Sequence, residues 1–270
     1  MHKKTHYLRE DLAKQWQEKD PFSMVKQAEG EIFRQKEGRR TLRFILGGKS
    51  YFLKYHQGIG WAEIIKNLLQ FRLPIISAKN EWLAIQLLEQ NQIDSMQIAA
   101  YGERGWNPAK KESFLVTDEL VDTMNLEYLG EQWRKTPPTF RSKLSLITKI
   151  ANISRKMHES GLNHRDFYLC HFLLDKSFST TNTIEDATSL FLIDLHRAQI
   201  RKKVPQRWLV KDIGSLYFSA LNVELTQRDR YRFIKLYSGQ PLRQALSEQQ
   251  SFWGKVAKRA TQLRDNGKAE

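Results

Sequence analysis

The 270-residue sequence predicts an α+β protein made of a small, β-rich lobe followed by a larger, mainly helical lobe. Alternating apolar residues between turn-forming glycines dominate the segment 30–56, whereas helical periodicity dominates from residue 137 onward. The sequence has neither an internal repeat nor a long linker rich in glycine and proline, so the two lobes are expected to be closely coupled. We therefore predict a first lobe of residues 1–120 and a second lobe of residues 121–270.

The first lobe is predicted to contain four strands and two helices. Residues 30–56 alternate in polarity and are interrupted at Glu37-Gly38 and at Gly47-Gly48, which indicates three strands joined by tight turns. The segments 61–71 and 82–88 space their apolar residues as helices do. We expect the first of these helices to pack its apolar face within the lobe, with a bilayer interface as the alternative. Residues 113–120 form the fourth predicted strand.

The second lobe begins with a long predicted helix. Pro137 and Pro138 precede an amphipathic pattern that runs from about residue 140 to 157, and Gly161 is placed to end the helix. Residues from Asn163 onward are therefore expected to form a loop. Two short apolar runs, 172–174 and 190–193, flank a polar segment and predict a hairpin, and the pattern beyond Lys211 is mostly helical.

Composition restricts the class of protein. Lys and Arg total 44 against 30 Asp and Glu, so the net charge is +14 and the pI is about 9.8. The single cysteine, Cys170, excludes an internal disulfide and indicates a reducing compartment. No segment approaches the roughly 20 apolar residues that span a bilayer, and the N-terminus lacks the apolar core of a secretory signal. We expect a cytoplasmic protein whose charge serves an anionic partner, a membrane surface or solubility alone.

The segment from His164 to His171 carries the most specific chemical signal. It matches the kinase catalytic loop, H-R-D-x-x-x-x-N, at every defined position except the last, where His171 stands. The second strand of the predicted hairpin ends at Asp194, which is where a kinase places its metal-binding aspartate. Upstream, Lys54 ends a predicted strand segment and Glu81 opens a helix, the contexts of the kinase lysine–glutamate ion pair.

These four positions suit phosphoryl transfer because its transition state spreads negative charge over the transferred group and depends on placed cations and alignment. Asp166 would accept the proton of the acceptor hydroxyl. Lys54, paired with Glu81, would hold the phosphates of ATP, and Asp194 would hold Mg²⁺. Each residue taken alone also fits a plain structural role, such as a solvated strand lysine or an acid in the first turn of a helix. Their agreement in order and in context favours a protein-kinase-like bilobal fold.

Three departures from the general kinase pattern are visible. The Gly-rich phosphate loop is missing, and the first hairpin offers Arg39 and Arg40 near its tip, so we expect these guanidinium groups to contact the nucleotide phosphates. His171 replaces the asparagine that binds a second metal, and Mg²⁺ prefers oxygen ligands, so His171 is a doubtful metal ligand. No A-P-E motif follows Asp194, which disfavours a protein-kinase activation segment.

With these motifs, the sequence resembles the lipopolysaccharide core heptose(I) kinases of the WaaP/RfaP type, and the resemblance covers nearly the whole chain. It is carried by RRTLRF (39–44), KSYFLKYH (49–56), RKMHESGLNHRDFYLCHFLL (155–174) and IDLHRAQIRKKVP (193–205). The resemblance implies a protein-kinase-like fold and a kinase that uses ATP and Mg²⁺. It also implies phosphorylation of the first heptose of the inner core, at its 4-hydroxyl, on the cytoplasmic face of the inner membrane of a Gram-negative bacterium.

The resemblance also implies site residues and partners. Asp166 would be the catalytic base, Asp194 the metal ligand, and Lys54 with Glu81 the nucleotide-binding pair. The segment 117–120 would be the hinge, with Thr117 and Glu119 contacting adenine through main-chain groups. Members of the family have been associated with acyl carrier protein, which is acidic, although nothing in the composition selects that partner.

The positive charge of the sequence is concentrated in two segments. Residues 34–54 and residues 195–211 each carry a net charge of +6, and the second segment contains no acid. Because the second segment follows Asp194, we expect it to contact an anionic acceptor, the lipopolysaccharide inner core with lipid A. Its alternative is a solvated charged face. The predicted acceptor-binding residues are Arg197, Arg201, Lys202, Lys203 and Arg207.

Other functions remain open from the sequence. A kinase for a second heptose or for Kdo, and a protein kinase, are the enzymatic alternatives. A basic nucleic-acid-binding protein and a catalytically inactive kinase-like binding module are the non-enzymatic ones. No helix-turn-helix, RNP or zinc-knuckle pattern is evident, so nucleic acid is not an expected partner.

Overall fold

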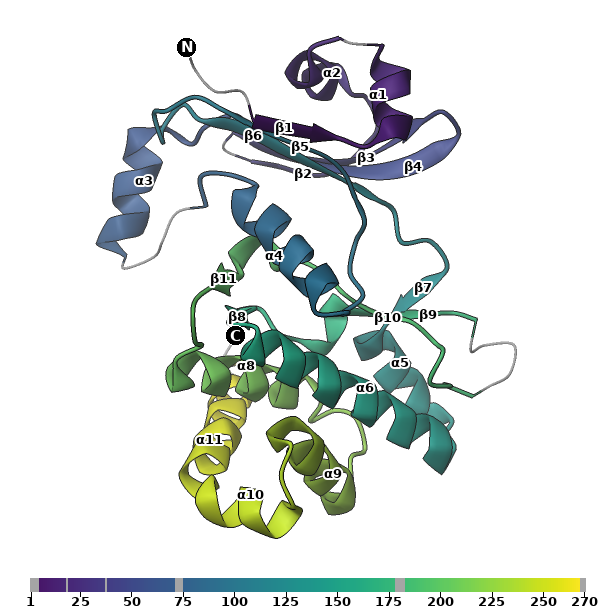
Figure 1. Ribbon diagram of the computed structural model, residues 1–270. Helices are drawn as coiled ribbons and strands as arrows, with labels where there is room; N and C mark the ends of the chain where they lie inside the picture. The colour runs from purple at the N-terminus through teal and green to yellow at the C-terminus, as the bar shows by residue number, and fades with distance from the viewer. Residues whose placement is uncertain (1–4, 18, 37, 71–74, 178–182, 268–270) are drawn as a thin grey trace. The chain divides into compact units, whose positions relative to one another are not determined.

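A computed structural model of the chain describes residues 5–17, 19–36, 38–70, 75–177 and 183–267 (Figure 1). Its contacts divide the chain into two compact units, one of Met1–Ile85 with Met96–Leu120 and one of Gln86–Ser95 with Val121–Glu270. The later break follows Leu120, where the sequence suggests a boundary, while residues 86–95 group with the second unit. The first unit is built on a sheet and the second is mainly helical, so the α+β prediction is confirmed.

The first unit contains a six-stranded antiparallel sheet in the order β1-β5-β6-β4-β3-β2. Three neighbours are β2 (Glu31–Lys36), β3 (Arg39–Leu46) and β4 (Lys49–His56), which confirms the three strands predicted between residues 30 and 56. Gly38, Gly47 and Gly48 all have positive φ, as tight turns between these strands require. The remaining strands are β1 (Thr5–Leu8), β5 (Ile98–Arg104) and β6 (Glu112–Asp118).

Two short helices, α1 (Glu10–Trp16) and α2 (Pro21–Gln27), cover one face of this sheet (Figure 1). Their buried side chains join alternate side chains of the strands in one apolar core, which contains Leu12, Trp16, Phe22, Val25, Leu42, Tyr51, Leu53, Tyr55 and Phe114. Because successive side chains of a strand point to opposite faces, the residues between them in β4 point away from α1 and α2. Lys54 is one of these residues.

The helix α3 (Gly60–Leu69) differs from the sequence expectation. Ile64 is buried, but four other apolar side chains of α3 are between 52% and 75% exposed: Trp61, Ile65, Leu68 and Leu69. The expectation that the apolar face of this helix packs within its lobe is therefore wrong for most of that face. Residue 71, which the pattern also assigned to the helix, lies outside the described residues.

The second unit begins with β7 (Thr123–Asn125), α5 (Leu126–Lys135) and α6 (Phe140–Glu159). Gly161 has a φ of 87° directly after the capping residue Ser160, so the predicted end of this helix is confirmed. The predicted hairpin is also confirmed, because β9 (Phe172–Asp175) and β10 (Leu190–Leu192) pair in an antiparallel sheet with β7. A second small sheet joins β8 (Leu162–Asn163) to β11 (Gln199–Ile200).

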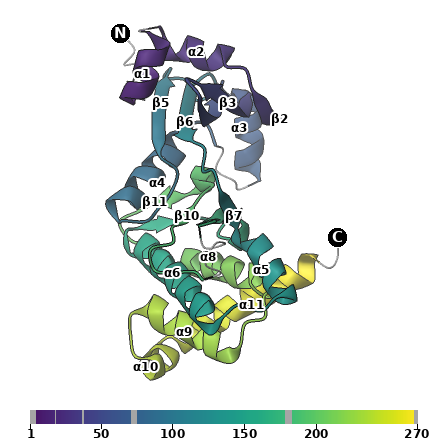
Figure 2. The same ribbon diagram turned by 90° about the vertical axis from the view of Figure 1, so that its right-hand side faces the viewer.

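The helices α8 (Gln206–Ser219), α9 (Gln227–Ser238), α10 (Leu242–Glu248) and α11 (Gln250–Gly267) complete the second unit. In both views α9, α10 and α11 gather beside α6 and α8 (Figures 1 and 2), where α11 packs on α8 and α9 packs on α6. None of the described helices is long and apolar enough to cross a membrane.

Candidate active site

Lys54 and Glu81 form an ion pair in the first unit. Lys54 Nζ donates to Glu81 Oε1 at 2.7 Å, and the Glu81 side chain is 3% exposed. Glu81 lies in the first turn of α4 (Lys79–Gln90), and Trp82 beside it stacks on Tyr101 of β5 at 4.2 Å between ring centroids. A buried carboxylate needs a charged partner, and Lys54 supplies it from the sheet face opposite α1 and α2. The two residues that the sequence paired are thus in contact.

The other predicted nucleotide-binding residues have main-chain or side-chain partners within the first unit. Arg39 Nη2 donates to the carbonyl of Ile75 at 2.5 Å. Arg40 Nη2 donates to the carbonyls of Val25 and Lys26 at 2.8 and 3.1 Å. Thr117 is a buried residue of β6, and the Glu119 carboxylate accepts from Arg43 Nη1 at 3.2 Å. Arg40 therefore lies on the α2 face of the sheet, opposite Lys54, and this position does not support its predicted contact with the phosphates. Contact of Arg39, Thr117 and Glu119 with a nucleotide stays a prediction.

The predicted catalytic loop, residues 163–171, is held by a carboxylate that the sequence analysis did not single out. Asp212 of α8 is fully buried and accepts hydrogen bonds from the main-chain N–H groups of His164 at 2.7 Å and Arg165 at 2.9 Å. His158 Nε2 lies 3.3 Å from the same side chain. Arg165 has a φ of 76°, a conformation that is costly for a residue with a side chain and is retained where surrounding contacts impose it.

His164 fixes the loop to the strand that carries Asp194. Its Nε2 lies 2.9 Å from the carbonyl of Ile193, and its Nδ1 lies 3.3 Å from the N–H of Asp166. Burial lowers the pKa of His164, which favours the neutral ring that these two contacts require. The ring is enclosed in the core of the unit, so we assign it a positioning role.

Asp166 and Asp194 each have cationic neighbours in the second unit. Arg197 Nη1 donates to Asp166 Oδ1 at 2.7 Å. His196 Nδ1 lies 2.6 Å from Asp194 Oδ1, and His171 Nε2 lies 3.5 Å from Asp194 Oδ2. His171 Nδ1 also lies 2.6 Å from the carbonyl of Asp166. The imidazole of His171 therefore links the main chain of one predicted catalytic aspartate to the side chain of the other.

The neighbours of His171 raise the pKa of its imidazole. Burial would lower its pKa, but hydrogen bonding to Cys170 and to the Asp166 carbonyl, with the charge of Asp194, raises the pKa of His171 to about 9. Metal binding by His171, which the sequence made doubtful, stays a prediction. Within the described residues, no group of three or more His, Cys, Asp and Glu side chains is arranged to hold a metal ion. Mg²⁺ commonly binds one or two carboxylates together with substrate phosphates, so Asp194 by itself fits such an ion.

The five predicted acceptor-binding residues lie in three different surroundings. Arg197 is paired with Asp166, as described above. Arg201 is bonded to Asn163 and Gln199, and lies with Arg207 around the indole of Trp208. Lys202 and Lys203 are exposed and line a separate, open depression with Arg155, His158 and Tyr237. Contact of any of them with an acceptor stays a prediction.

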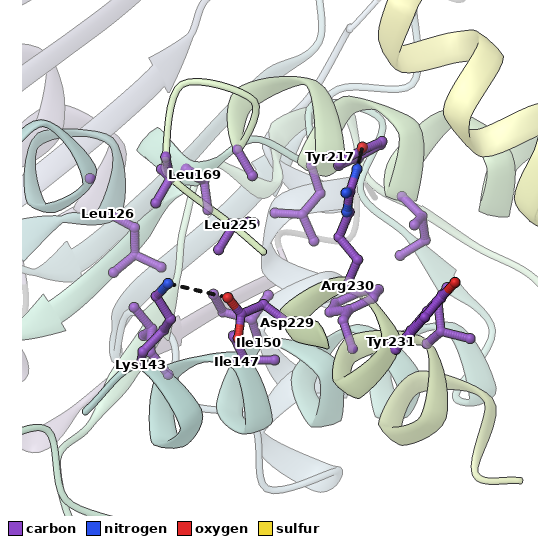
Figure 3. A pocket seen from close by; sticks show the side chains of 18 of the residues that line it. Leu126, Lys143, Ile147, Ile150, Leu169, Tyr217, Leu225, Asp229, Arg230 and Tyr231 are labelled. Carbon is purple, nitrogen blue, oxygen red and sulfur yellow. Dashed lines mark hydrogen bonds and ion pairs between the residues drawn. The ribbon is translucent and has the colours of Figure 1, made fainter. Parts of the chain in front are cut away.

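An apolar cavity of about 390 Å³ in the second unit was not predicted from the sequence. Residues of α5, α6, α8, α9 and α11 line it, among them Leu129, Leu146, Ile150, Leu216, Ile234 and Val256. Figure 3 shows polar groups at two places of its wall, where Lys143 Nζ donates to Asp229 at 3.2 Å and Arg230 donates to the hydroxyl of Tyr217 at 2.9 Å. Each lining helix has an ordinary amphipathic pattern, so only the packing reveals the space between them.

Comparison with known proteins places this site in a family. The sequence model of the lipopolysaccharide kinase (Kdo/WaaP) family matches residues 23–237. The lipopolysaccharide core heptose(I) kinase WaaP of Escherichia coli strain K12 is 48% identical over 96% of both chains. The enzyme of the same name from Pseudomonas aeruginosa is 45% identical over 95% of this chain and 94% of its own.

A solved structure described as WaaP in complex with acyl carrier protein is also similar. Its TM-score is 0.82 at 39% sequence identity, and the match covers 96% of this chain and 99% of that one. The catalytic-loop motif, the Lys54–Glu81 pair and these matches agree with one another. The chain belongs to the lipopolysaccharide kinase (Kdo/WaaP) family.

Proposed function

We propose that this protein is a lipopolysaccharide core heptose(I) kinase, which transfers the γ-phosphate of ATP to the 4-hydroxyl of the first heptose of the inner core. The observation that carries the proposal is the loop that positions Asp166 beside Asp194 through His164 and His171, in a chain 45–48% identical to heptose(I) kinases over nearly its whole length. No feature of the structure favours one of the other core sugars or a protein as the acceptor.

Asp166 is the proposed catalytic base. Arg197 holds Oδ1 of this carboxylate, so we assign Oδ2 to the proton of the acceptor hydroxyl. A base positioned within hydrogen-bond reach of the attacking hydroxyl typically contributes 10²- to 10⁴-fold to the rate. The bonds from Asp212 to the main chain of His164 and Arg165 support this geometry because they fix the residues on which Asp166 is carried.

Nucleotide binding is assigned to residues of the first unit. Lys54, oriented by Glu81, would contact the ATP phosphates, with Arg39 on the first hairpin beside it, and main-chain groups at Thr117 and Glu119 would contact adenine. Asp194 would hold Mg²⁺, and when bound this ion neutralises charge on the phosphates. The basic residues Arg197, Arg201, Lys202, Lys203 and Arg207 would contact the anionic acceptor.

Mass spectrometry of core oligosaccharide tests this function. Cells of the source bacterium that lack the gene should accumulate a core whose first heptose carries no phosphate, and the gene supplied in trans should restore the phosphate at the 4-position. Restoration by the Asp166→Asn variant, or a core that is unchanged when the gene is removed, would contradict the proposal.

Acyl carrier protein is a proposed partner. The relative of known structure is described as a complex with it, and two features of this chain support the same partner. The net charge of +14 suits an acidic protein, and the 390 Å³ apolar cavity suits an aliphatic chain, the group that an acyl carrier protein carries. Acylated carrier protein should therefore be retained by the immobilised kinase, and carrier protein without an acyl chain should be retained less. Equal retention of both would contradict a role for the cavity.

Peripheral attachment to the cytoplasmic face of the inner membrane is also proposed. The exposed apolar side chains of α3, with Lys66 on the same helix, form the kind of amphipathic surface that lies at the boundary between lipid headgroups and acyl chains. Such a position would bring the kinase to an acceptor that is itself anchored by lipid A.

A further inference from the structure

Four cationic side chains of the second unit surround one indole ring. We call Trp208 with these four residues the Trp208 cluster. Lys211 Nζ lies 4.5 Å from the centroid of the indole, and the guanidinium carbons of Arg165, Arg207 and Arg201 lie at 5.2, 5.5 and 5.6 Å. Residues 207–211 belong to the first turns of α8, Arg201 follows β11, and Arg165 belongs to the catalytic loop. Segments far apart in the sequence thus bring their positive charges to one place.

Two carboxylates, Asp166 and Asp212, attract Arg165, and each of them has other partners. Asp212 already accepts hydrogen bonds from two main-chain N–H groups and lies beside His158, and Asp166 accepts from Arg197. The Nε of Arg165 is buried and has no hydrogen-bond partner among the described residues. A buried donor left without a partner typically costs about 1–3 kcal/mol, so the arrangement is unfavourable in the protein by itself.

The positive charges in and beside the cluster also repel one another. Burial lowers the pKa of Arg165, and the positive charge of Arg197 lowers it further. Burial lowers the pKa of Lys211, and the charges of Arg259 and Arg165 add to that effect. The indole face attracts cations and offsets part of this repulsion, which is why Trp208 can hold the four groups together. A bound anion would reduce the repulsion that remains among the four cations.

We propose that the Trp208 cluster binds an anionic group of the acceptor, a carboxylate or a phosphate, while the heptose hydroxyl lies at Asp166. This inference rests on the proposed function. The cluster adjoins the catalytic base through the chain, because Arg165 precedes Asp166 directly, and through Arg197, which bonds to Asp166 and adds its charge to Arg165. Arg165 thereby joins the acceptor site that the sequence placed on the segment 195–211, and Trp208 and Lys211 of that segment join Arg201 and Arg207 as its proposed contacts.

The double variant Arg207→Gln/Lys211→Gln tests the site, because both side chains are exposed and their removal spares the fold. We expect the KM for purified core lipopolysaccharide without the heptose phosphate to rise roughly tenfold or more, the effect of losing one or two charge-assisted hydrogen bonds. The KM for ATP and the melting temperature should stay near those of the wild type. Lys255→Gln/Lys258→Gln removes the same charge from exposed positions of α11 and is the matched control, with unchanged KM for both substrates.

A titration of the acceptor without ATP separates this inference from the proposed function. Wild-type protein that binds the acceptor tightly, and the double variant that binds it at least roughly tenfold more weakly, would support the cluster whether or not the heptose is phosphorylated. Equal affinity of wild type and double variant, equal weakening in the Lys255/Lys258 control, or failure of the wild type to bind would overturn it. Absence of phosphate transfer by a wild type that binds would overturn the proposed function alone.

The source of the anion follows from two modified acceptors. If the cluster binds a core carboxylate, reduction of the core carboxyl groups should abolish the difference in affinity between wild type and double variant, and removal of the lipid A phosphates should preserve it. The reverse pattern identifies a lipid A phosphate. A difference that survives both treatments would contradict either anion as the ligand.

Trp208 itself is proposed as a positioning residue. Trp208→Phe keeps an aromatic face and Trp208→Leu does not, so affinity for the acceptor should fall in the order wild type, Phe variant, Leu variant, with an unchanged KM for ATP. Equal affinities of the Phe and Leu variants would show that the indole fills space without ordering the cations.

Discussion

Asp212 is the residue on which the geometry of the catalytic loop most depends. Its two carboxylate oxygens accept from the N–H groups of His164 and Arg165, and the second of these residues has a φ of 76°. Both N–H groups are directed inward, so without Asp212 they would be buried without acceptors. We therefore treat the positive φ of Arg165 as a conformation imposed by Asp212.

Replacing Asp212 should lower both stability and turnover. Asp212→Ala leaves two buried N–H groups without partners, so we expect a loss of about 2–5 kcal/mol in the free energy of unfolding, measured with urea. Asp212→Asn retains one acceptor oxygen and should lose less. Turnover should fall in both variants because Asp166 follows the two anchored residues. An Ala variant with the stability and turnover of the wild type would contradict the anchoring role.

Single residues differ in how well the sequence predicts them. Lys54 and Glu81 are 27 positions apart, yet the kinase pattern pairs them, and they are in contact. Asp212 belongs to no short motif that the sequence analysis used. The sequence does contain a signal for this residue, because Asp212 stands among apolar residues in a predicted helix. An acid on a buried helix face needs a hydrogen-bond partner or a counter-charge, so a structural role for Asp212 could have been expected. The partners are main-chain groups of a loop about 48 residues earlier, which no pattern along the chain identifies.

At the scale of helices and strands, the elements with a strong hydrophobic periodicity are the ones that the sequence predicts correctly. Helix α6 and the strands β2, β3 and β4 have long alternating or helical patterns and clear end signals, and all were predicted. The strand β5 was missed because its sequence, IAAYGER, contains small residues and a glycine, which favour strands weakly. The seven-residue helices α1 and α2 were also missed, since each is too short to establish a period.

The start of α9 gives a prediction for stability as a function of pH. Thr226 and Asp229 form a capping box, and the Asp229 carboxylate also accepts from Lys143 and Arg232. Burial would raise the pKa of Asp229, but the bonds to Thr226 and Lys143 lower it below the ordinary value of 3.8. The carboxylate therefore stabilises the fold above pH 3.8, and this contribution is lost as the pH falls below that value.

The Asp229→Asn variant measures this contribution. At pH 7 it should be about 1–3 kcal/mol less stable than the wild type, because a hydrogen-bonded charge is replaced by a neutral amide between two cations. The difference should shrink as the pH is lowered below 3.8, toward the lowered pKa at which the carboxylate of the folded wild type becomes protonated. A difference that is independent of pH between 7 and 3 would mean that the side chain acts by its shape and not by its charge.

At the scale of the whole molecule, charge and exposed apolar surface both point to a lipid-linked, anionic acceptor. The net charge of +14 is concentrated in two segments, and four apolar side chains of α3 are between 52% and 75% exposed. The sequence predicted the charge distribution directly, since charge is read from composition. The exposure of α3 could not be predicted, because an amphipathic period is the same for a helix on a core and a helix on a bilayer.

Membrane binding should depend on α3. In Ile65→Glu/Leu68→Glu two side chains that are 53% and 52% exposed become charged, and we expect the fraction bound to vesicles with anionic lipids to fall roughly tenfold or more. Ile45→Glu, at a position 74% exposed in β3, is the matched control and should bind as the wild type does. Vesicle binding by the wild type, the α3 variant and the Ile45→Glu control should weaken with added salt. Equal partition of the α3 variant and the control would exclude α3 as the membrane contact.

The most direct test of the account is transfer of the ATP γ-phosphate to purified core lipopolysaccharide that lacks the heptose phosphate, with the product located by mass spectrometry. The wild type should place one phosphate on the first heptose. Asp166→Asn should do so roughly 10²- to 10⁴-fold more slowly while keeping the wild-type melting temperature and affinity for ATP. A wild type that leaves the heptose unmodified, or an Asn variant with undiminished turnover, would contradict the assignment of Asp166 as the base of a heptose kinase.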